Sequence, residues 1–224
     1  MPEKNTTTWL GASCMVQTKS NRTFCLLFRS VYVRMLQKGG NPMNRAIKFK
    51  LKTGKIVTIR RIRGTDADAM IKFLDKFSHD TGAIWTTQYA GQPKKNKEGA
   101  VEFYENPNNL SIGVWDGDMV IGMSSVVKQL VDHPYYMGIT AGIWMFFLQE
   151  YTHNGLGTKL LQLMEKWARE NGVKVLTGKI RHLNVPSIAN CIKAGFLITG
   201  INHNAAKIHG KIMHAYTVEK VLDE

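Results

Sequence analysis

The clearest chemical signal in the chain is the turn Tyr151-Thr152-His153-Asn154-Gly155-Leu156-Gly157-Thr158. A Gly-x-Gly turn that opens a helix presents several free backbone N–H groups at the positive end of the helix dipole. Such a turn can hold a phosphate or a diphosphate. The same pattern also occurs as a simple tight connection, so the turn alone does not decide between the two interpretations.

The two commonest phosphate-binding motifs do not fit this turn. A dinucleotide-binding fold has a third glycine three residues after Gly157, where this chain has Leu160. A P-loop has Gly-Lys-Ser or Gly-Lys-Thr, and the turn has neither. The ligand must therefore be inferred from the elements around the turn.

These elements predict a strand, an anion-binding turn and a helix. The apolar run 139–148 precedes the turn and belongs to a strand expected over 135–148. A helix is expected over 155–171, ended by Asn171-Gly172, because apolar residues recur there at helical spacing: Leu156, Leu160, Leu163, Met164 and Trp167.

The rest of the chain alternates between strand and helix signals. Thr65 and Asp68 form a variant capping box before a helix with an apolar face, and Asp116-Gly117 joins two apolar strands in a hairpin. Residues 80–108 are expected to be irregular, with short helical pieces. Further strands are expected over 55–63, 110–115, 119–127, 173–180, 196–203 and 211–221, with a helix over 186–193. This order predicts an α/β fold with a mixed, largely antiparallel central sheet and flanking helices.

Composition narrows the class of protein. The chain has 224 residues, a formal net charge of +13 and 44% hydrophobic residues. No apolar run reaches the about 18 residues of a membrane-spanning helix, and no motif for nucleic acid accompanies the charge, so neither partner is expected. The three cysteines show no disulfide or metal spacing. These features favour a soluble, cytoplasmic protein without a metal site.

The first 42 residues differ in composition from the rest of the chain. They hold six Lys or Arg residues but one acid, and the apolar patch 24–36 is interrupted by Arg29 and Arg34, which is poor for a signal peptide. A mitochondrial presequence is one interpretation. Another is that Met43 is the true start, because Lys38-Gly39-Gly40 can be encoded by a purine run typical of a bacterial ribosome-binding leader. We therefore expect a poorly packed extension over 1–42 and a single domain over 43–224.

Four segments together resemble the GNAT superfamily of N-acyltransferases. They are 59–69, which is similar to the family's opening strand and helix, the hairpin 114–122, the turn 152–157, and 184–196 with its Asn and Gly-Phe pair. The resemblance covers nearly all of 55–221. It implies direct transfer of an acetyl group from acetyl-CoA to a primary amine of a small molecule or protein within a ternary complex, in a bacterial-type enzyme.

The resemblance also implies where acetyl-CoA lies. Its diphosphate would contact the loop and the start of the helix, and the strand before the loop would expose main-chain groups to the pantetheine arm, with a further contact from an Asn after the next strand. The implied cofactor-binding residues are Met145, Phe147, Leu148, Thr152, His153, Asn154, Gly155, Leu156, Gly157, Thr158 and Asn184. A structural interpretation stands beside this one, in which the side chains at 145–148 belong to the core and Asn184 caps a helix.

The chain departs from the family pattern at several positions. Thr152 stands where the family often has Arg or Gln, so His153, Lys159 or the general basic field would have to compensate. Cys191 stands where many members have a Tyr that protonates the departing thiolate. A thiol with a pKa of about 8.5 could donate this proton, or Cys191 could be a buried residue while solvent supplies the proton.

The general base is less defined. Members that acetylate protein N-termini have a Glu where this chain has Lys179, which argues against that subclass. Candidates for the base are Glu150, Asp132, His133 and Tyr136, while Glu102 and Glu105 could bind a cationic amine. A non-catalytic acyl-CoA-binding module is the alternative function. A homodimer formed through an exposed final strand is also considered.

Overall fold

The computed structural model describes residues 45–79, 96–129, 140–208 and 210–222. The chain divides into two units, residues 1–39 and 40–224. The first unit lies outside the described residues, and so does the whole of the extension predicted over 1–42. All of the described residues belong to the second unit. None of its described helices is long and apolar enough to cross a membrane.

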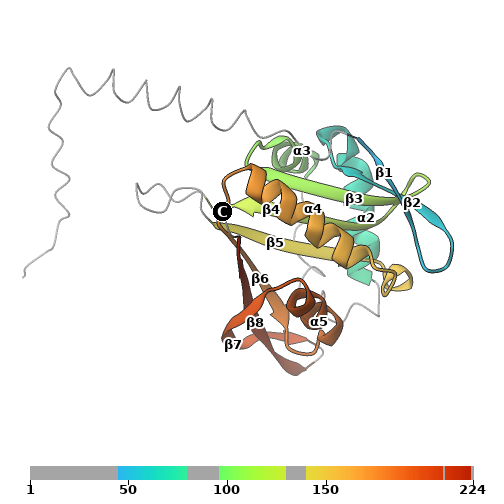
Figure 1. Ribbon diagram of the computed structural model, residues 1–224. Helices are drawn as coiled ribbons and strands as arrows, with labels where there is room; N and C mark the ends of the chain where they lie inside the picture. Colours follow the sequence, from blue (N-terminus) through green and yellow to red (C-terminus); the bar gives the residue numbers. More distant parts are fainter. Residues whose placement is uncertain (1–44, 80–95, 130–139, 209, 223–224) are drawn as a thin grey trace, which may run out of the picture. The chain divides into compact units, whose positions relative to one another are not determined.

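One eight-stranded sheet organises the described residues (Figure 1). The strands are β1 (Ile47–Lys50), β2 (Ile56–Arg61), β3 (Asn109–Asp116), β4 (Met119–Lys128), β5 (Thr140–Phe147), β6 (Val175–Arg181), β7 (Leu197–Ile208) and β8 (Lys211–Val221). Their order is β1-β2-β3-β4-β5-β6-β8-β7. Every pair is antiparallel except β5 with β6. The predicted mixed, largely antiparallel α/β fold is confirmed.

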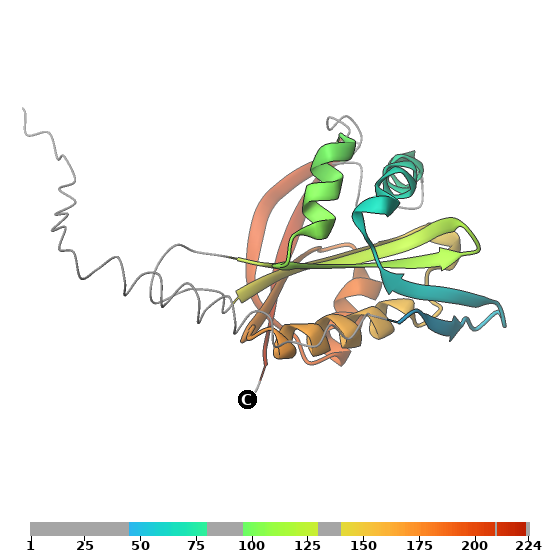
Figure 2. The same cartoon turned by 90° about the horizontal axis from the view of Figure 1, so that it is seen from above.

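Helices cover both faces of this sheet (Figure 2). They are α2 (Ala67–His79), α3 (Lys97–Glu105), α4 (Leu156–Glu170) and α5 (Val185–Lys193), with 3₁₀ turns η1 (Gly64–Asp66) and η3 (Gln149–Tyr151). One core joins α4 and α5 to the sheet and includes Leu160, Met164 and Cys191. The other joins α2 and α3 to the opposite face and includes Met70 and Tyr104. Alternation along β3 divides its side chains between them, because neighbouring residues of a strand face opposite sides.

The structure corrects several predicted details. Strand β1 and the nine-residue helix α3 were not predicted as such, the latter falling in the region expected to be irregular. Strand β7 is the edge of the sheet, and the final strand β8 lies between β6 and β7, so the prediction of an exposed final strand was wrong. The strand expected over 135–148 is described from Thr140, because residues 130–139 lie outside the described part.

The predicted capping box at Thr65 and Asp68 was also wrong. The first helical turn begins earlier, at Gly64, and the carboxylate that closes it belongs to Asp66, which accepts a hydrogen bond from Arg63 N–H at 2.9 Å. Asp68 instead forms an exposed ion pair with Lys97 at 2.7 Å. Because both acids lie near the start of the helix, the sequence pattern did not distinguish them.

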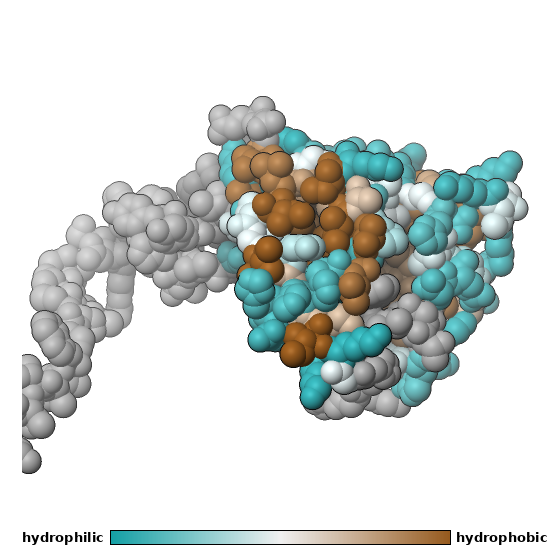
Figure 3. Space-filling view, turned by 90° about the horizontal axis from the view of Figure 1, so that it is seen from below, coloured by the Kyte–Doolittle hydropathy of each residue, from teal (hydrophilic) through white to brown (hydrophobic). Residues whose placement is uncertain are grey.

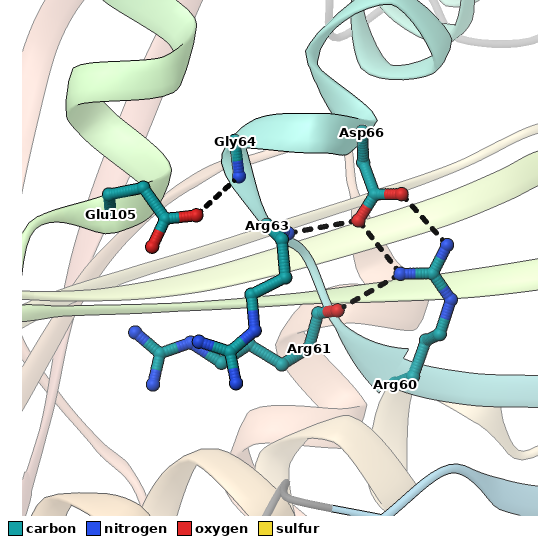
Figure 4. Close-up of polar contacts among 6 residues, drawn as sticks. All are labelled: Arg60, Arg61, Arg63, Gly64, Asp66 and Glu105. Carbon is teal, nitrogen blue, oxygen red and sulfur yellow. Dashed lines mark hydrogen bonds and ion pairs between the residues drawn. The ribbon is translucent and has the colours of Figure 1, made fainter.

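Asp66 also joins β2 to the start of α2 (Figure 4). The Arg60 guanidinium donates two hydrogen bonds to its carboxylate, at 2.7 and 2.9 Å, and lies 4.0 Å above the Trp115 ring. Gly64 N–H donates to Glu105 at 2.6 Å, which ties the same turn to α3. Partial burial raises the pKa of Asp66, but the hydrogen bonds from Arg60 and Arg63 outweigh this effect, so its pKa is lowered.

We expect Asp66→Asn to lower the free energy of unfolding by about 1–3 kcal/mol, because it removes a bidentate charged pair that is partly shielded from water. A lowered pKa in the folded state stabilises the protein above the unfolded pKa of about 3.9, and this contribution is lost as the pH falls through the lowered value. Urea unfolding at neutral and acidic pH measures both effects. The matched control is Asp68→Asn, since its pair with Lys97 is exposed and should contribute about 0.5 kcal/mol or less. Equal losses in the two variants would contradict the prediction.

Candidate active site

The predicted anion-binding turn connects η3 to α4, and its backbone takes an unusual course. His153 and Gly155 have positive φ angles of 60° and 82°, and Gly155 is the N-cap of α4. A positive φ strains any residue with a Cβ, so glycine is favoured at 155. The helix then begins with Leu156, and its first full turn is closed by Lys159 N–H donating to Gly155 O at 3.1 Å. The N–H groups ahead of Lys159 have no acceptor within the helix.

The Asn154 side chain holds this turn in shape. Its amide nitrogen donates to the carbonyls of Tyr151 and Thr152, at 3.4 and 3.0 Å. Its oxygen accepts from Lys52 N–H, at 3.2 Å, in the connection between β1 and β2. A Cβ atom added to Gly155 would lie 3.8 Å from Cζ of the Phe49 ring in β1. The β1–β2 hairpin, which is absent from the sequence prediction, therefore supports the loop from one side.

Helix α5 supports the loop from another side. Thr158 donates a hydrogen bond through its hydroxyl to Asn190 Oδ1 at 2.7 Å. A Cβ on Gly157 would lie 3.1 Å from Asn190 Nδ2, so the small residue at 157 permits this close packing. Sequence reasoning missed Asn190. Its only signal was its place on the predicted helix 186–193, one residue before Cys191.

The strand before the loop has one open edge. Strand β5 pairs with β4 from Ala141 to Phe147, but its parallel pairing with β6 ends at Gly142 and Thr177. Beyond these residues the two strands diverge (Figure 1). Leu148 N–H donates to Ile121 O of β4 at 2.9 Å. Because successive residues of a strand direct their main-chain groups to opposite edges, Met145 and Phe147 direct theirs into the gap.

The side chains of β5 fill the two cores, as the structural interpretation predicted. Met145 and Phe147 pack against the core beneath α4, and a Cβ on Gly122 would overlap the Phe147 ring. On the opposite face, the ring centroids of Phe146 and Phe77 lie 5.2 Å apart, and those of Trp144 and Phe103 lie 6.0 Å apart. Met145 and Phe147 can therefore serve both interpretations, because their side chains pack against the core while their main-chain groups face the gap.

The first residue of the turn, Tyr151, is bonded to the β3–β4 hairpin. The Tyr151 hydroxyl donates to Asp116 at 2.7 Å, and Lys55 forms an ion pair with the same carboxylate. Glu150, a predicted base, lies next to them with an exposed side chain, 3.8 Å from Lys76 Nζ of α2. Thr152 donates to Gln149 O at 2.8 Å, and the His153 side chain is exposed. Of the predicted loop residues, Thr152 and Asn154 thus stabilise the turn itself.

Cys191 and Asn184 both belong to α5. Cys191 is buried in the core shared with α4, and burial raises its pKa to about 11, so its thiol keeps its proton at neutral pH. Asn184 is the N-cap of α5, where its side chain accepts from Ser187 N–H at 3.3 Å. This is the capping role that the sequence offered as the alternative to a contact with the cofactor.

The other residues predicted to act as the general base or to bind the amine are not brought together at the start of α4. Glu105 accepts a hydrogen bond from Gly64 N–H at the junction of η1 and α3, and Glu102 is exposed on α3. Asp132, His133 and Tyr136 lie outside the described residues. Within the described ranges, no three His, Cys, Asp or Glu side chains are arranged to hold a metal ion.

The structure places a helix start with unpaired N–H groups beside an open strand edge. A sequence comparison identifies the family of the chain. A family model described as the acetyltransferase (GNAT) family matches residues 74–196, more than half of the chain. The chain belongs to the GNAT family. Members of the family use acetyl-CoA. No curated protein matches the chain significantly in sequence.

Several solved GNAT structures share the fold. The acetyltransferase of the GNAT family from Streptococcus pneumoniae has a TM-score of 0.65 at 19% identity, covering 74% of this chain and 99% of that one. YncA from Salmonella typhimurium, described with its cofactor acetyl-CoA, has a TM-score of 0.62 at 21% identity, covering 75% and 95%. A ribosomal-protein-alanine N-acetyltransferase from Brucella melitensis has a TM-score of 0.59 at 22% identity, covering 73% and 99%. At these identities the likeness concerns the fold.

We expect Asn154→Ala to weaken acetyl-CoA binding to this GNAT protein by about tenfold, because the loop loses three side-chain hydrogen bonds and must be ordered by the ligand. Isothermal titration calorimetry measures the change. The control is Asn106→Ala, which removes a similar bond from a distant turn, to Asn108 N–H at 2.9 Å. It should lower stability slightly and leave affinity unchanged. An unchanged affinity in Asn154→Ala would show that the ligand does not depend on this turn.

Proposed function

We propose that this protein moves an acetyl group from acetyl-CoA directly to a primary amine of a small molecule or a protein, with donor and acceptor bound together. The observation that carries the proposal is the gap between β5 and β6, which opens onto the start of α4. A thioester with a long amide-containing arm and a diphosphate needs both features side by side. The family assignment supports acetyl-CoA as the donor. The amine acceptor is our inference from the resemblance described above.

In the proposed complex the diphosphate lies on the N–H groups of residues 154–158. The pantetheine arm lies in the gap and exchanges hydrogen bonds with the main chain of Met145 and Phe147. Phosphate binding here depends on the backbone, because the Thr152 hydroxyl is already used within the turn. Lys52, whose main-chain N–H bonds to Asn154, and Lys159, in the first turn of α4, add positive charge to this end of the protein.

The reaction itself needs two proton transfers. A neutral amine attacks the thioester carbonyl carbon, the carbon–sulfur bond breaks, and the amine loses a proton while the sulfur gains one. We assign the first transfer to Glu150, acting through water, because its carboxylate is exposed immediately before the loop. For the second, the pKa of about 11 makes Cys191 a weaker acid than an ordinary thiol of about 8.5, so a proton from solvent is favoured.

The acceptor is proposed to approach from the face of the sheet that carries Trp144 and Phe146. On this side, opposite α4, the half-buried rings of Trp144 and Phe103 have their centroids 6.0 Å apart, next to the core that holds Phe77. A half-buried aromatic pair suits the carbon skeleton of an amine-bearing side chain or small molecule. Lys179 stands where members that acetylate protein N-termini have Glu, so we place such acceptors outside the proposal.

We expect a saturating concentration of acetyl-CoA, about a hundred times its dissociation constant, to stabilise the protein by about 2.7 kcal/mol, which corresponds to a rise in Tm of about 5–10 °C. Gly155→Glu should abolish this rise, since it adds bulk and negative charge where the diphosphate binds. Gly172→Glu is the matched control, because Gly172 also has a positive φ, of 72°, at the opposite end of the same helix. A Gly155→Glu variant that still responds would place the ligand elsewhere.

The proton transfers are tested by release of free thiol from acetyl-CoA with a panel of amines. Glu150→Gln should lower kcat/KM by at least tenfold, whereas Cys191→Ala should change kcat by less than about threefold. A large loss in Cys191→Ala would instead assign the second transfer to the thiol. No release with any amine, despite tight acetyl-CoA binding, would favour a non-catalytic acyl-CoA-binding module.

A further inference from the structure

Strand β6 carries two cationic side chains on one face of the sheet, beside the gap. Gly178 of β6 lies opposite Val218 of β8, and Val218 belongs to the core beneath α4 and α5. Because neighbouring residues of a strand face opposite sides of the sheet, Lys179 and Arg181 face away from these helices. The Lys179 side chain is exposed, and that of Arg181 is half-buried. The two charges thus occupy successive rows of one face, about 6.6 Å apart along the strand.

The two cations lie across the gap from two aromatic side chains. When the register of the last paired row between β5 and β6 is continued, Trp144 is level with Lys179, and Phe146 is level with Arg181. The side chains of Trp144 and Phe146 also lie on the face opposite α4. On this face the gap therefore separates an aromatic side from a positively charged side.

An acidic side chain lies on the same face, at the closed end of the gap, where β5 and β6 are still paired. Glu219 of β8 is directly opposite Thr177, which belongs to the last paired row. The β8 residues opposite the two cations, Thr217 and Ala215, are uncharged. The charge beside the gap therefore changes from negative at the closed end to positive towards the open end, next to the start of α4.

This order of charges is more specific than the general polarity of the surface. Seen from the end of the molecule that carries α5, β7 and β8, hydrophobic and hydrophilic side chains lie next to one another (Figure 3). A zwitterion is complementary to the charges beside the gap if its ammonium group faces the acid and its carboxylate faces the cations. A polyamine, or a lysine side chain in a basic peptide, would instead bring a second positive charge against Lys179.

We propose that the acceptor is a free amino acid, whose carboxylate is bound by Lys179 and Arg181. Ammonium and guanidinium groups form strong hydrogen bonds to a carboxylate. The amine of the amino acid then points to the closed end of the gap, towards Glu219, and an apolar side chain lies against Trp144. This inference rests on the acetyl transfer proposed above and names the class of its acceptor.

The proposed position of acetyl-CoA agrees with this orientation. The diphosphate lies at the open end and the pantetheine arm runs along β5, so the thioester lies nearer the closed end, beside the amine. The amine nitrogen forms a bond to the acetyl carbon as the carbon–sulfur bond breaks, which gives an N-acetyl amino acid and the free thiol of CoA. The nitrogen gives up one proton, and the sulfur takes one up.

Release of free thiol from acetyl-CoA tests the inference with phenylalanine and leucine, each compared with its decarboxylated amine, phenethylamine or 3-methylbutylamine. Phenylalaninamide, which keeps the ring and the amine but has no carboxylate, is a further comparison. In the wild type, kcat/KM should be at least tenfold higher for the amino acids, because a charged hydrogen-bonded pair is lost with the carboxylate. Lys179→Gln should remove most of this preference, and Lys179→Glu should reverse it.

The matched control is Lys50→Gln. It removes the same charge from an exposed position of β1, at the other edge of the sheet, and should leave the preference for amino acids unchanged. Phenethylamine should be turned over by Lys179→Gln within about threefold of the wild-type rate, because this amine does not use the lysine. Equal kcat/KM for amino acids and decarboxylated amines in the wild type would overturn the inference and leave acetyl transfer intact. A preference that survives in both Lys179 variants would do the same.

A binding measurement separates this inference from the proposed transfer. Isothermal titration calorimetry of the protein saturated with CoA should show binding of phenylalanine or leucine that Lys179→Gln weakens at least tenfold, whether or not an acetyl group is transferred. Binding of neither amino acid would overturn the inference. Carboxylate-dependent binding without thiol release from any amine would contradict the proposed transfer and retain the amino acid site.

Discussion

The unequal pairing of β5 is the constraint on which the rest of the site depends. On one side β5 is bonded to β4 over seven residue pairs, and on the other it is bonded to β6 over three. Strand β6 continues instead with β8, over seven pairs from Val175 to Arg181. The strands β1 to β5 are therefore continuously paired, and so are β6, β8 and β7. Main-chain groups are left unpaired where β5 and β6 diverge. A ligand that supplies hydrogen bonds there completes the sheet.

The loop at the open end is shaped by segments from distant parts of the sequence. Lys52 from the β1–β2 connection bonds to Asn154, Asp116 from the β3–β4 hairpin bonds to Tyr151, and Asn190 from α5 bonds to Thr158. Three separate supports fix a turn that would otherwise have to be ordered by its ligand. Because an ordered loop does not lose this conformational freedom on binding, the proposed contact of a diphosphate with the backbone does not require a dedicated side chain.

The features that could be predicted from the sequence are those encoded locally. Gly155, Gly157 and the apolar positions after them defined the loop and α4, and Asp116-Gly117 defined the hairpin. Strand β1 alternates over four residues, Ile47 to Lys50, which is too short a pattern to distinguish from chance. The position of β8 inside the sheet is a matter of long-range pairing, and no local pattern reports it. Asn190 likewise matters through a contact with Thr158, 32 positions away.

The departures from the family pattern have a common physical explanation. Thr152 stabilises the turn through its bond to Gln149, and Cys191 fills a core position in which its raised pKa disfavours proton donation. Both residues therefore serve structure where other members are expected to use side chains for binding or proton transfer. In the proposed reaction such a substitution is tolerable, because holding a neutral amine against a thioester removes most of the entropic barrier by positioning alone. In the proposed reaction the leaving sulfur takes its proton from solvent, whereas the alignment of the two reactants can come only from the protein.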